Sequence, residues 1–262
     1  MEGRSAGSNE KTGRGAKLKL LFAGLIRAAL PALVFGLLAA MIVGPAPKGT
    51  DISNIMIAVY GARIEHVEDV GLLAALFIFA PPLLQLVLLG DTIPRAVEED
   101  VYTLARTNNR MGWMIKKLIK VIVLSLLMSF LMLLSIYLYS RVRGSGSAEL
   151  VPRAVLELMA TWGLCQCAFT VLSNVIGLYI KPLYMIFITL FSYALGIVLM
   201  LTRHPAANFF PTVQGMLYAH RSIFGRLEEG FFTPVFSAGY LSAVILALSA
   251  FGAVRIRKKD LL

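Results

Sequence analysis

Few residues of this chain carry side chains that could do chemistry, and the densest group lies in the polar stretch 91–120. Three consecutive acids, Glu98, Glu99 and Asp100, are followed there by Arg106. Such acids could act as general bases or metal ligands if histidines or cysteines lay beside them. The histidines lie elsewhere, and no H-E-x-x-H pattern occurs. We therefore expect no catalytic site and no metal site, and this chain is not expected to be an enzyme.

The cysteines and histidines support the same expectation. Cys165 and Cys167 are two residues apart within an apolar run, so a helix would point them to different faces. This arrangement favours a packing role over a disulfide or a metal site. The histidines, His66, His204 and His220, all fall in loops between apolar runs. No Ser/His/Asp set can be assembled on one side of a membrane from this spacing.

The elements that must position the polar stretch are apolar. The chain has 262 residues, of which 58% are hydrophobic and 15% charged, a composition that needs lipid as solvent. Six runs are long enough to cross a hydrocarbon core as helices. They are approximately 20–43, 70–90, 118–139, 154–180, 182–202 and 234–254. The predicted fold is therefore an all-α membrane protein with six transmembrane helices.

The distribution of basic residues predicts the orientation. Sixteen Lys and Arg residues lie in the two tails and in the second and fourth loops, against eight in the other three loops. The positive-inside rule then places both termini and the polar stretch in the cytoplasm. The formal net charge of +10 reflects this topology and attraction to anionic lipid, and we expect no nucleic-acid partner. We divide the chain into a disordered basic tail (1–19), a transmembrane domain (20–254) and a second basic tail (255–262).

Two further features concern a possible path through the membrane. Pro81 and Pro82 lie near the middle of the second run, and adjacent prolines predict a kink or break that could line a substrate path. The outer loop 203–233 contains aromatic pairs typical of the membrane interface, and we expect interfacial or re-entrant helices in it. Gln166, Ser173 and Asn174 are interpreted as polar contacts between helices.

The polar stretch predicts a short helix of its own, in the cytoplasmic loop 91–117. Asp91 or Thr92 could cap it, Pro94 suits its first turn, and the three acids are expected in its early turns. An apolar stripe with helical spacing consists of Val97, Val101 and Leu104. The turn-prone residues that end the helix are Arg106, Asn108, Asn109 and Arg110. A narrow stripe flanked by mixed charge favours docking into a groove of a soluble partner.

These features together resemble the permease subunits of ABC-2 type exporters. The resemblance rests on six spans, a helix between the second and third, an elaborated last outer loop and a basic final segment reading RIRKKDLL. In that family a glutamate precedes a Leu-x-x-x-Arg-type stretch, and Glu98 or Glu99, Leu104 and Arg106 to Arg110 occupy those places. The resemblance implies a loop helix that couples the membrane domain to a separate soluble ABC ATPase. Val97, Glu98, Glu99, Asp100, Val101, Leu104, Arg106, Asn108, Asn109 and Arg110 are the coupling residues it implies.

The same resemblance implies a second permease copy or paralogue as partner, in a multi-pass protein of a bacterial cytoplasmic membrane. No G-x-x-x-x-G-K-[S/T] occurs, so ATP and Mg²⁺ are expected on the ATPase and no cofactor on this chain. The apolar spans favour an amphipathic or hydrophobic cargo such as a peptide, drug or lipid.

Two alternatives remain open. A secondary transporter or a membrane anchor without transport activity would fit the composition, although ion-coupled carriers usually keep ionisable residues near mid-membrane. An intramembrane protease of the Glu-Glu-x-x-x-Arg type fits less well, because six residues separate Glu99 from Arg106.

Overall fold

The structure is a computed structural model that describes residues 26, 28–42, 52–60, 71–106, 109–143, 152–202, 204–217 and 233–258. In this part of the chain all regular secondary structure is helical, and no strand occurs. Several predicted features lie outside the described residues: the tail 1–19, the last four residues, His66, His220, Asn108 and most of the outer loop after residue 217.

The described helices begin with an unlabelled one at Ala28–Ile42. The labelled helices are α2 (Ile52–Tyr60), α3 (Leu72–Leu89), α4 (Thr92–Glu99), α5 (Val101–Arg106), α6 (Arg110–Arg143), α7 (Pro152–Leu158), a π-helical turn (Met159–Gly163), α8 (Leu164–Ile176), α9 (Pro182–Leu201), a 3₁₀ turn (Pro205–Phe209), α10 (Pro211–Gly215) and α11 (Pro234–Lys258).

Five helical runs are long and apolar enough to cross a membrane. They are Ala75–Glu99, Arg110–Arg143, Pro152–Ile176, Pro182–Leu201 and Pro234–Arg257. They correspond to five of the six predicted spans. The first predicted span is described only as Ala28–Ile42, which at about 1.5 Å per residue is shorter than a hydrocarbon core of about 30 Å. The chain is thus a multi-pass membrane protein by the length and composition of its helices.

Proline sets the start of several of these helices. Pro152, Pro182 and Pro234 each occupy the first residue of a long helical run. Proline is well suited to this position because its missing N–H would have no intrahelical partner there and its φ is already helical. Gly90 and Gly177 follow the last residues of α3 and α8. The second span thus ends close to the expected residue 90, whereas the fourth ends before the expected residue 180.

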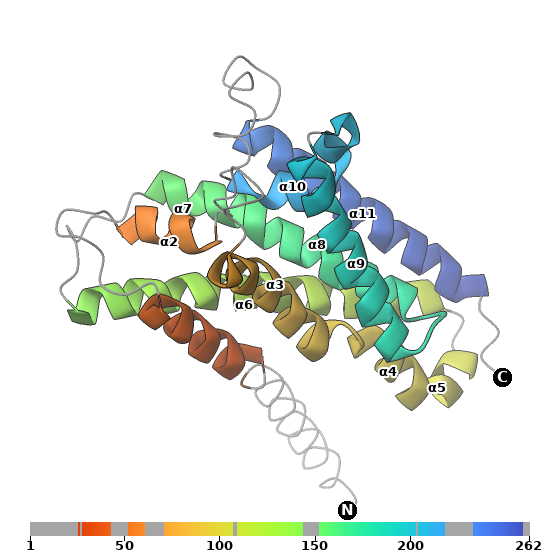
Figure 1. Cartoon of the computed structure of the whole chain (residues 1–262). Helices are drawn as coiled ribbons and strands as arrows, with labels where there is room; N and C mark the ends of the chain where they lie inside the picture. The colour runs from red at the N-terminus through yellow and green to blue at the C-terminus, as the bar shows by residue number, and fades with distance from the viewer. Residues whose placement is uncertain are drawn as a thin grey trace, which may run out of the picture.

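Helix α8 lies at the centre of the bundle, where it contacts α3, α6, α9, α10 and α11 (Figure 1). Ten of its thirteen residues are buried, whereas α9 and α11 keep many apolar side chains exposed, including Phe187, Phe191 and Leu246. Figure 1 also shows α4 and α5 at one end of the bundle and α2, α7 and α10 toward the other. This separation places the polar stretch far from the elements of the predicted outer loops.

The expected break at Pro81 and Pro82 is not present. Helix α3 runs without interruption from Leu72 to Leu89, with both prolines inside it. Both are buried, and α3 packs against α6, α8 and α9. Neighbouring helices of a membrane bundle can hold a proline-containing segment in helical form although two backbone donors are missing. The second span therefore has no break at these two residues.

The opposite end contains the helical segments expected in the last outer loop. The 3₁₀ turn and α10 lie against α9, and α10 also contacts α8 and α11. Four residues of α10 are buried, so it is inserted among the spans rather than laid over them. Thr212 Oγ1 donates to the Tyr193 carbonyl at 3.1 Å, and Ser237 Oγ donates to Gln214 Oε1 at 2.7 Å.

A π-helical turn interrupts the fourth span, and the sequence contained no signal for it. The backbone N–H of Leu164 donates to the Met159 carbonyl five residues earlier. The turn presents Trp162 to Tyr60 of α2, and their rings stack with centroids 4.4 Å apart. Cys165 and Cys167, just beyond the turn, are free and buried, which agrees with the packing role expected of them.

Candidate functional site

The polar stretch forms two short helices, α4 and α5, instead of the single helix that was expected. They meet at Asp100, whose φ of −98° and ψ of 13° end α4 after Glu99. Pro94 lies in the first turn, as expected. The acids, however, lie in the last turn of α4 and at the junction, because α4 ends there rather than continuing to Arg106. Glu98 and Glu99 therefore lack the favourable interaction with the N-terminus of α4 that was expected for them, whereas Asp100 directly precedes the first residue of α5.

The apolar stripe of this segment faces the interior of the same chain. Val97 is 6% exposed and Leu104 is 1% exposed, and both join a core cluster that includes Met114 of α6 and Ile256 of α11. Val101 is half-buried. The expectation that Val97 and Leu104 dock directly into a partner groove is therefore wrong, since the spans of this chain already cover them. The stripe attaches α4 and α5 to the membrane helices.

A buried asparagine connects α4 to the central span. Asn174 of α8 is fully buried. Its Oδ1 accepts a hydrogen bond from the Ile93 backbone N–H at 2.8 Å. Its Nδ2 donates to the carbonyl oxygens of Leu89 at 2.7 Å and Thr170 at 2.9 Å. One side chain thus holds the end of α3, the start of α4 and the body of α8 together, as its interpretation as a contact between helices predicted.

The hydrogen bonds continue from Asn174 toward the middle of the spans. Thr170 Oγ1 donates to Gln85 Oε1 of α3 at 3.2 Å. Ser125 Oγ of α6 donates to the same oxygen at 2.7 Å, and Gln85 Nε2 donates to Ser129 Oγ at 2.9 Å. We call Asn174, Thr170, Gln85, Ser125 and Ser129 the polar ladder. It joins α4 to three spans through buried, neutral groups.

Not every buried polar residue of α8 takes part. Ser173 Oγ and both polar atoms of the Gln166 side chain are buried without a hydrogen-bond partner in the described part of the chain. The interpretation of these two residues as contacts between helices is therefore not supported by a hydrogen bond. Of Gln166, Ser173 and Asn174, Asn174 is the one whose hydrogen bonds reach the ends of neighbouring helices in the described part of the chain.

The junction between α4 and α5 is fastened to the start of α6. Asp100 accepts a hydrogen bond from Trp113 Nε1 at 3.2 Å and pairs with Lys117 Nζ at 3.4 Å. Arg110 Nε donates to the Leu104 carbonyl at 3.0 Å, next to the end of α5. Asn109 Oδ1 accepts from the Gly112 backbone N–H at 2.9 Å and so caps α6. Asp100, Asn109 and Arg110 thus have structural contacts within the chain.

The outward face of the segment is polar and exposed. Arg95, Glu98, Glu99 and Arg106 are exposed, and Tyr102 is 75% exposed. Of the coupling residues that the resemblance implied, Glu98, Glu99, Arg106 and Asn109 are the ones that solvent reaches most. The structure therefore separates the segment into a buried face toward the spans and a charged face away from them.

A groove lies between α4 and the turn that connects α8 to α9. Its volume is about 440 Å³, and its walls include Pro94, Arg95 and Glu98 on one side and Gly177, Tyr179 and Lys181 on the other. Gly177 makes this approach possible, because a Cβ there would lie 2.6 Å from Pro94 Cγ and Met185 Sδ. The α8–α9 turn gives little signal of a functional surface in the sequence, since Lys181 is its only charged residue. We call this surface the α4 groove.

Comparison of the chain with protein-family models, curated proteins and solved structures finds no match. The function therefore has to be argued from the helices, the polar ladder and the α4 groove.

Proposed function

We propose that this chain is the permease subunit of an ATP-driven exporter, and that α4 and α5 receive the movement of a separate soluble ATPase at the α4 groove. In this proposal both termini and the α4 end face the cytoplasm of a bacterial cell, as the distribution of basic residues favours. ATP and Mg²⁺ bind to the ATPase, and this chain has no catalytic site of its own.

The observation that carries the proposal is that α4 is attached to the spans in two ways, by its apolar face and by the hydrogen bonds of Asn174. Its outer face presents charge at the end of the bundle, while its inner face and Asn174 fix it to α3, α6 and α8. A push on the outer face would move these spans together, because packed helices transmit displacement as rigid elements. A surface helix that only rested among lipid headgroups would not need a buried hydrogen-bonded connection to the central span.

The chemistry of the spans favours this function over secondary transport. The buried polar side chains of the described residues are Gln, Ser, Thr and Asn, and none of them is charged. Coupling to an ion gradient generally uses an ionisable residue in the membrane. The polar ladder that connects α4 to the spans is neutral. This favours energy input from a soluble partner at α4 over coupling to an ion gradient. A membrane anchor without transport activity is the second alternative, and it would show no ATPase.

The cargo in this proposal is amphipathic or hydrophobic, because the spans expose few polar groups. A second permease copy or a paralogue completes the path. Helices α9 and α11 expose many apolar side chains, which could contact either lipid or that second permease.

The test is purification of the tagged chain from its own membrane in a mild detergent, followed by azido-ATP labelling of whatever soluble chain accompanies it. We expect a labelled ATPase with vanadate-sensitive activity. Lys181→Glu and Glu98→Lys reverse charges on opposite walls of the α4 groove, and each should reduce the recovered ATPase about tenfold or more, as for hot-spot residues of an interface.

Arg143→Glu is the matched control, since Arg143 is an exposed arginine at the far end of α6. It makes the same kind of charge reversal and should leave the ATPase bound. Absence of any azido-ATP-labelled chain would exclude the exporter. Full retention of the ATPase by both groove variants would exclude the α4 groove as its docking surface.

A further inference from the structure

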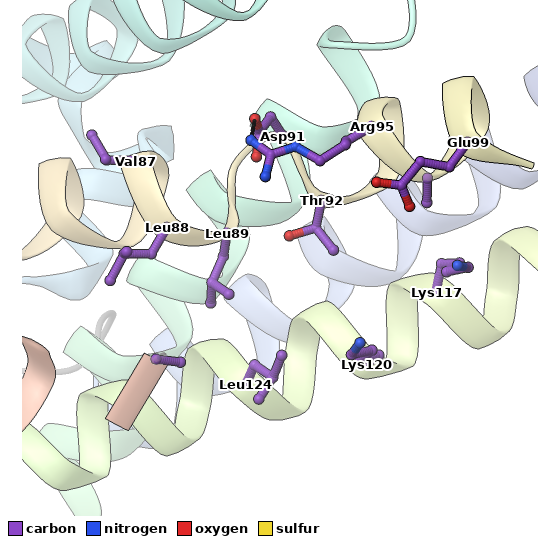
Figure 2. A pocket seen from close by; sticks show the side chains of 12 residues that line it. Val87, Leu88, Leu89, Asp91, Thr92, Arg95, Glu99, Lys117, Lys120 and Leu124 are labelled. Carbon is purple, nitrogen blue, oxygen red and sulfur yellow. Dashed lines mark hydrogen bonds and ion pairs between the residues drawn. The ribbon is translucent and has the colours of Figure 1, made fainter. Parts of the chain in front are cut away.

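A second cavity lies on the other side of α4, where apolar and charged residues meet. It has a volume of about 240 Å³ and is bounded by the start of the Ala28–Ile42 helix, the end of α3, α4 and α6. Figure 2 shows Val87, Leu88 and Leu124 at one end of it and Arg95, Glu99 and Lys117 at the other. This volume is far above the roughly 10–15 Å³ that one water molecule needs.

Three of the charged residues that line this cavity already have ion-pair partners. Asp91 Oδ2 accepts from Arg95 Nη2 at 2.6 Å. Lys117 pairs with Asp100 at 3.4 Å. Lys120 and Glu99 also line the cavity, and in the described part of the chain neither forms an ion pair. Among the described residues, the cavity therefore offers a ligand one cation, Lys120, and one anion, Glu99, that have no ion-pair partner.

The apolar end of the cavity continues along the outside of α3. Val87 is more than half exposed, and Leu83, one turn earlier on the same face, is also exposed. The apolar α3 ends at Gly90, next to the charged residues. The cavity is thus located where the hydrocarbon core of a membrane gives way to its headgroup layer.

From this arrangement we propose that the cavity binds a membrane phospholipid whose headgroup carries both a phosphate and a primary amine. The phosphate pairs with Lys120, supported by Lys117, and the ammonium group donates hydrogen bonds to Glu99. One acyl chain lies along Val87 and Leu83. The site belongs to the leaflet that borders α4, and it does not depend on the identity of any ATPase partner.

One cation, Lys120, and one anion, Glu99, favour a lipid headgroup with one phosphate and one amine over other membrane phospholipids. A phospholipid with an anionic headgroup that lacks an amine would leave Glu99 facing negative charge without a partner, which is unfavourable at short distance. A trimethylated amine keeps its charge but has no N–H to donate, so the charge-assisted hydrogen bond is lost. A free headgroup would gain nothing from the apolar wall.

The experiment is native mass spectrometry of the delipidated wild-type chain with equal amounts of phosphatidylethanolamine, phosphatidylcholine and phosphatidylglycerol of the same acyl composition. We expect retention of phosphatidylethanolamine to exceed that of each competitor by about threefold, the size of effect that a partly exposed ion pair supports. Soluble O-phosphoethanolamine should not displace the lipid. This comparison needs no variant and so does not depend on the folding of one.

Two variants assign the roles. Glu99→Gln should lower retention of phosphatidylethanolamine to the level of phosphatidylcholine, whereas Lys120→Gln should lower retention of both. Glu98→Gln and Lys116→Gln are matched controls, because they make the same changes on the same helices outside the cavity. Both should retain lipid as the wild type does.

Several results would overturn the inference. These are equal retention of the three lipids, preference for phosphatidylglycerol, displacement by O-phosphoethanolamine, or equal losses in the controls and the cavity variants. Each of them leaves the ATPase test at the α4 groove unaffected, so the two proposals can fail separately.

Discussion

At the scale of single residues, the Asn174 side chain supplies both the hydrogen-bond donor and the acceptor that the neighbouring helix ends need. The end of α3 leaves the Leu89 carbonyl without an intrahelical donor, and the start of α4 leaves the Ile93 N–H without an acceptor. A carboxamide can accept from one and donate to the other, and Asn174 does both. A carboxylate could only accept, and an apolar side chain could do neither.

We predict that Asn174→Leu destabilises the protein by about 2 kcal/mol, because it leaves buried backbone groups unpaired. Asn174→Asp should also destabilise it, since the donor to Leu89 is lost. The measurement is thermal unfolding of the purified chain in nanodiscs.

Ser173→Ala is the control for this pair of variants. Ser173 is the neighbouring residue, it is equally buried, and its hydroxyl has no hydrogen-bond partner in the described part of the chain. Its removal should leave the unfolding temperature unchanged or raise it slightly. Equal effects at positions 173 and 174 would contradict the role we assign to the Asn174 hydrogen bonds.

At the scale of elements, α10 depends on a close approach between backbones. A Cβ at Gly215 would lie 2.4 Å from Cys165 Cβ and 2.6 Å from its Sγ. Cys165 Cβ is bonded directly to the backbone and cannot rotate away, so α10 or α8 would have to move. Small residues at such crossings are common in membrane bundles, because they let helices pack closely.

Gly215→Ala should therefore destabilise the protein by about 1–3 kcal/mol, the usual cost of overpacking. Gly239→Ala, in the interior of α11, should have the opposite sign. A Cβ there meets nothing within 4 Å, and alanine stabilises a helix relative to glycine by about 0.5–1 kcal/mol. Thermal unfolding of both variants in the same lipid checks the prediction. A loss of stability at position 239 that equals the loss at position 215 would contradict it.

The elements differ in how far the sequence could predict them. The long spans were predictable because long apolar runs mark them, and three of them begin at a proline, namely Pro152, Pro182 and Pro234. Their ends were less predictable, since the third run was expected from 118 and α6 begins at Arg110. The division of the polar stretch into α4 and α5 was not, because it depends on Asp100 reaching Trp113 and Lys117 of the next helix. The same limit applies to the apolar stripe. Spacing showed that Val97 and Leu104 share a face, but not that α6 and α11 cover it.

The candidate site shows a similar pattern. The sequence directed attention to the stretch 91–120 and to its acids, of which Glu98 and Glu99 are exposed. It could not reveal that the α8–α9 turn lies opposite α4, because this contact brings together Pro94 and Gly177, which are far apart in the chain. The continuous helix at Pro81 and Pro82 was also unpredictable, since the packing of α3 against three neighbours outweighs the local preference of proline.

At the scale of the whole molecule, the two ends of the bundle should lie on opposite sides of the membrane. Arg106 at the end of α5 and Arg143 at the end of α6 are both exposed. Helix α6 has 34 residues, which at about 1.5 Å per residue exceeds a hydrocarbon core of about 30 Å. As a span, α6 is long enough for both of its ends to extend beyond the hydrocarbon core.

We predict that Arg106→Cys reacts with a membrane-impermeant maleimide only from the cytoplasm and Arg143→Cys only from outside. The native Cys165 and Cys167 are buried and should contribute little background. Labelling of intact cells and of inverted vesicles distinguishes the two sides. Reaction of both variants from the same side would contradict α6 as a span, and the reverse pattern would contradict the orientation.

The π-helical turn at Met159–Gly163 determines where in the fourth span the molecule can tolerate the deletion of one residue. Such a turn contains one residue more than an ordinary α-helical turn would need. Loss of one residue there, for example Ala160, would leave a regular helix in which every later residue of α8 keeps its face. Loss of a residue elsewhere in α8 would rotate all that follows by about 100°. We therefore expect a relative of this chain that is one residue shorter in the fourth span to lack that residue between positions 159 and 163.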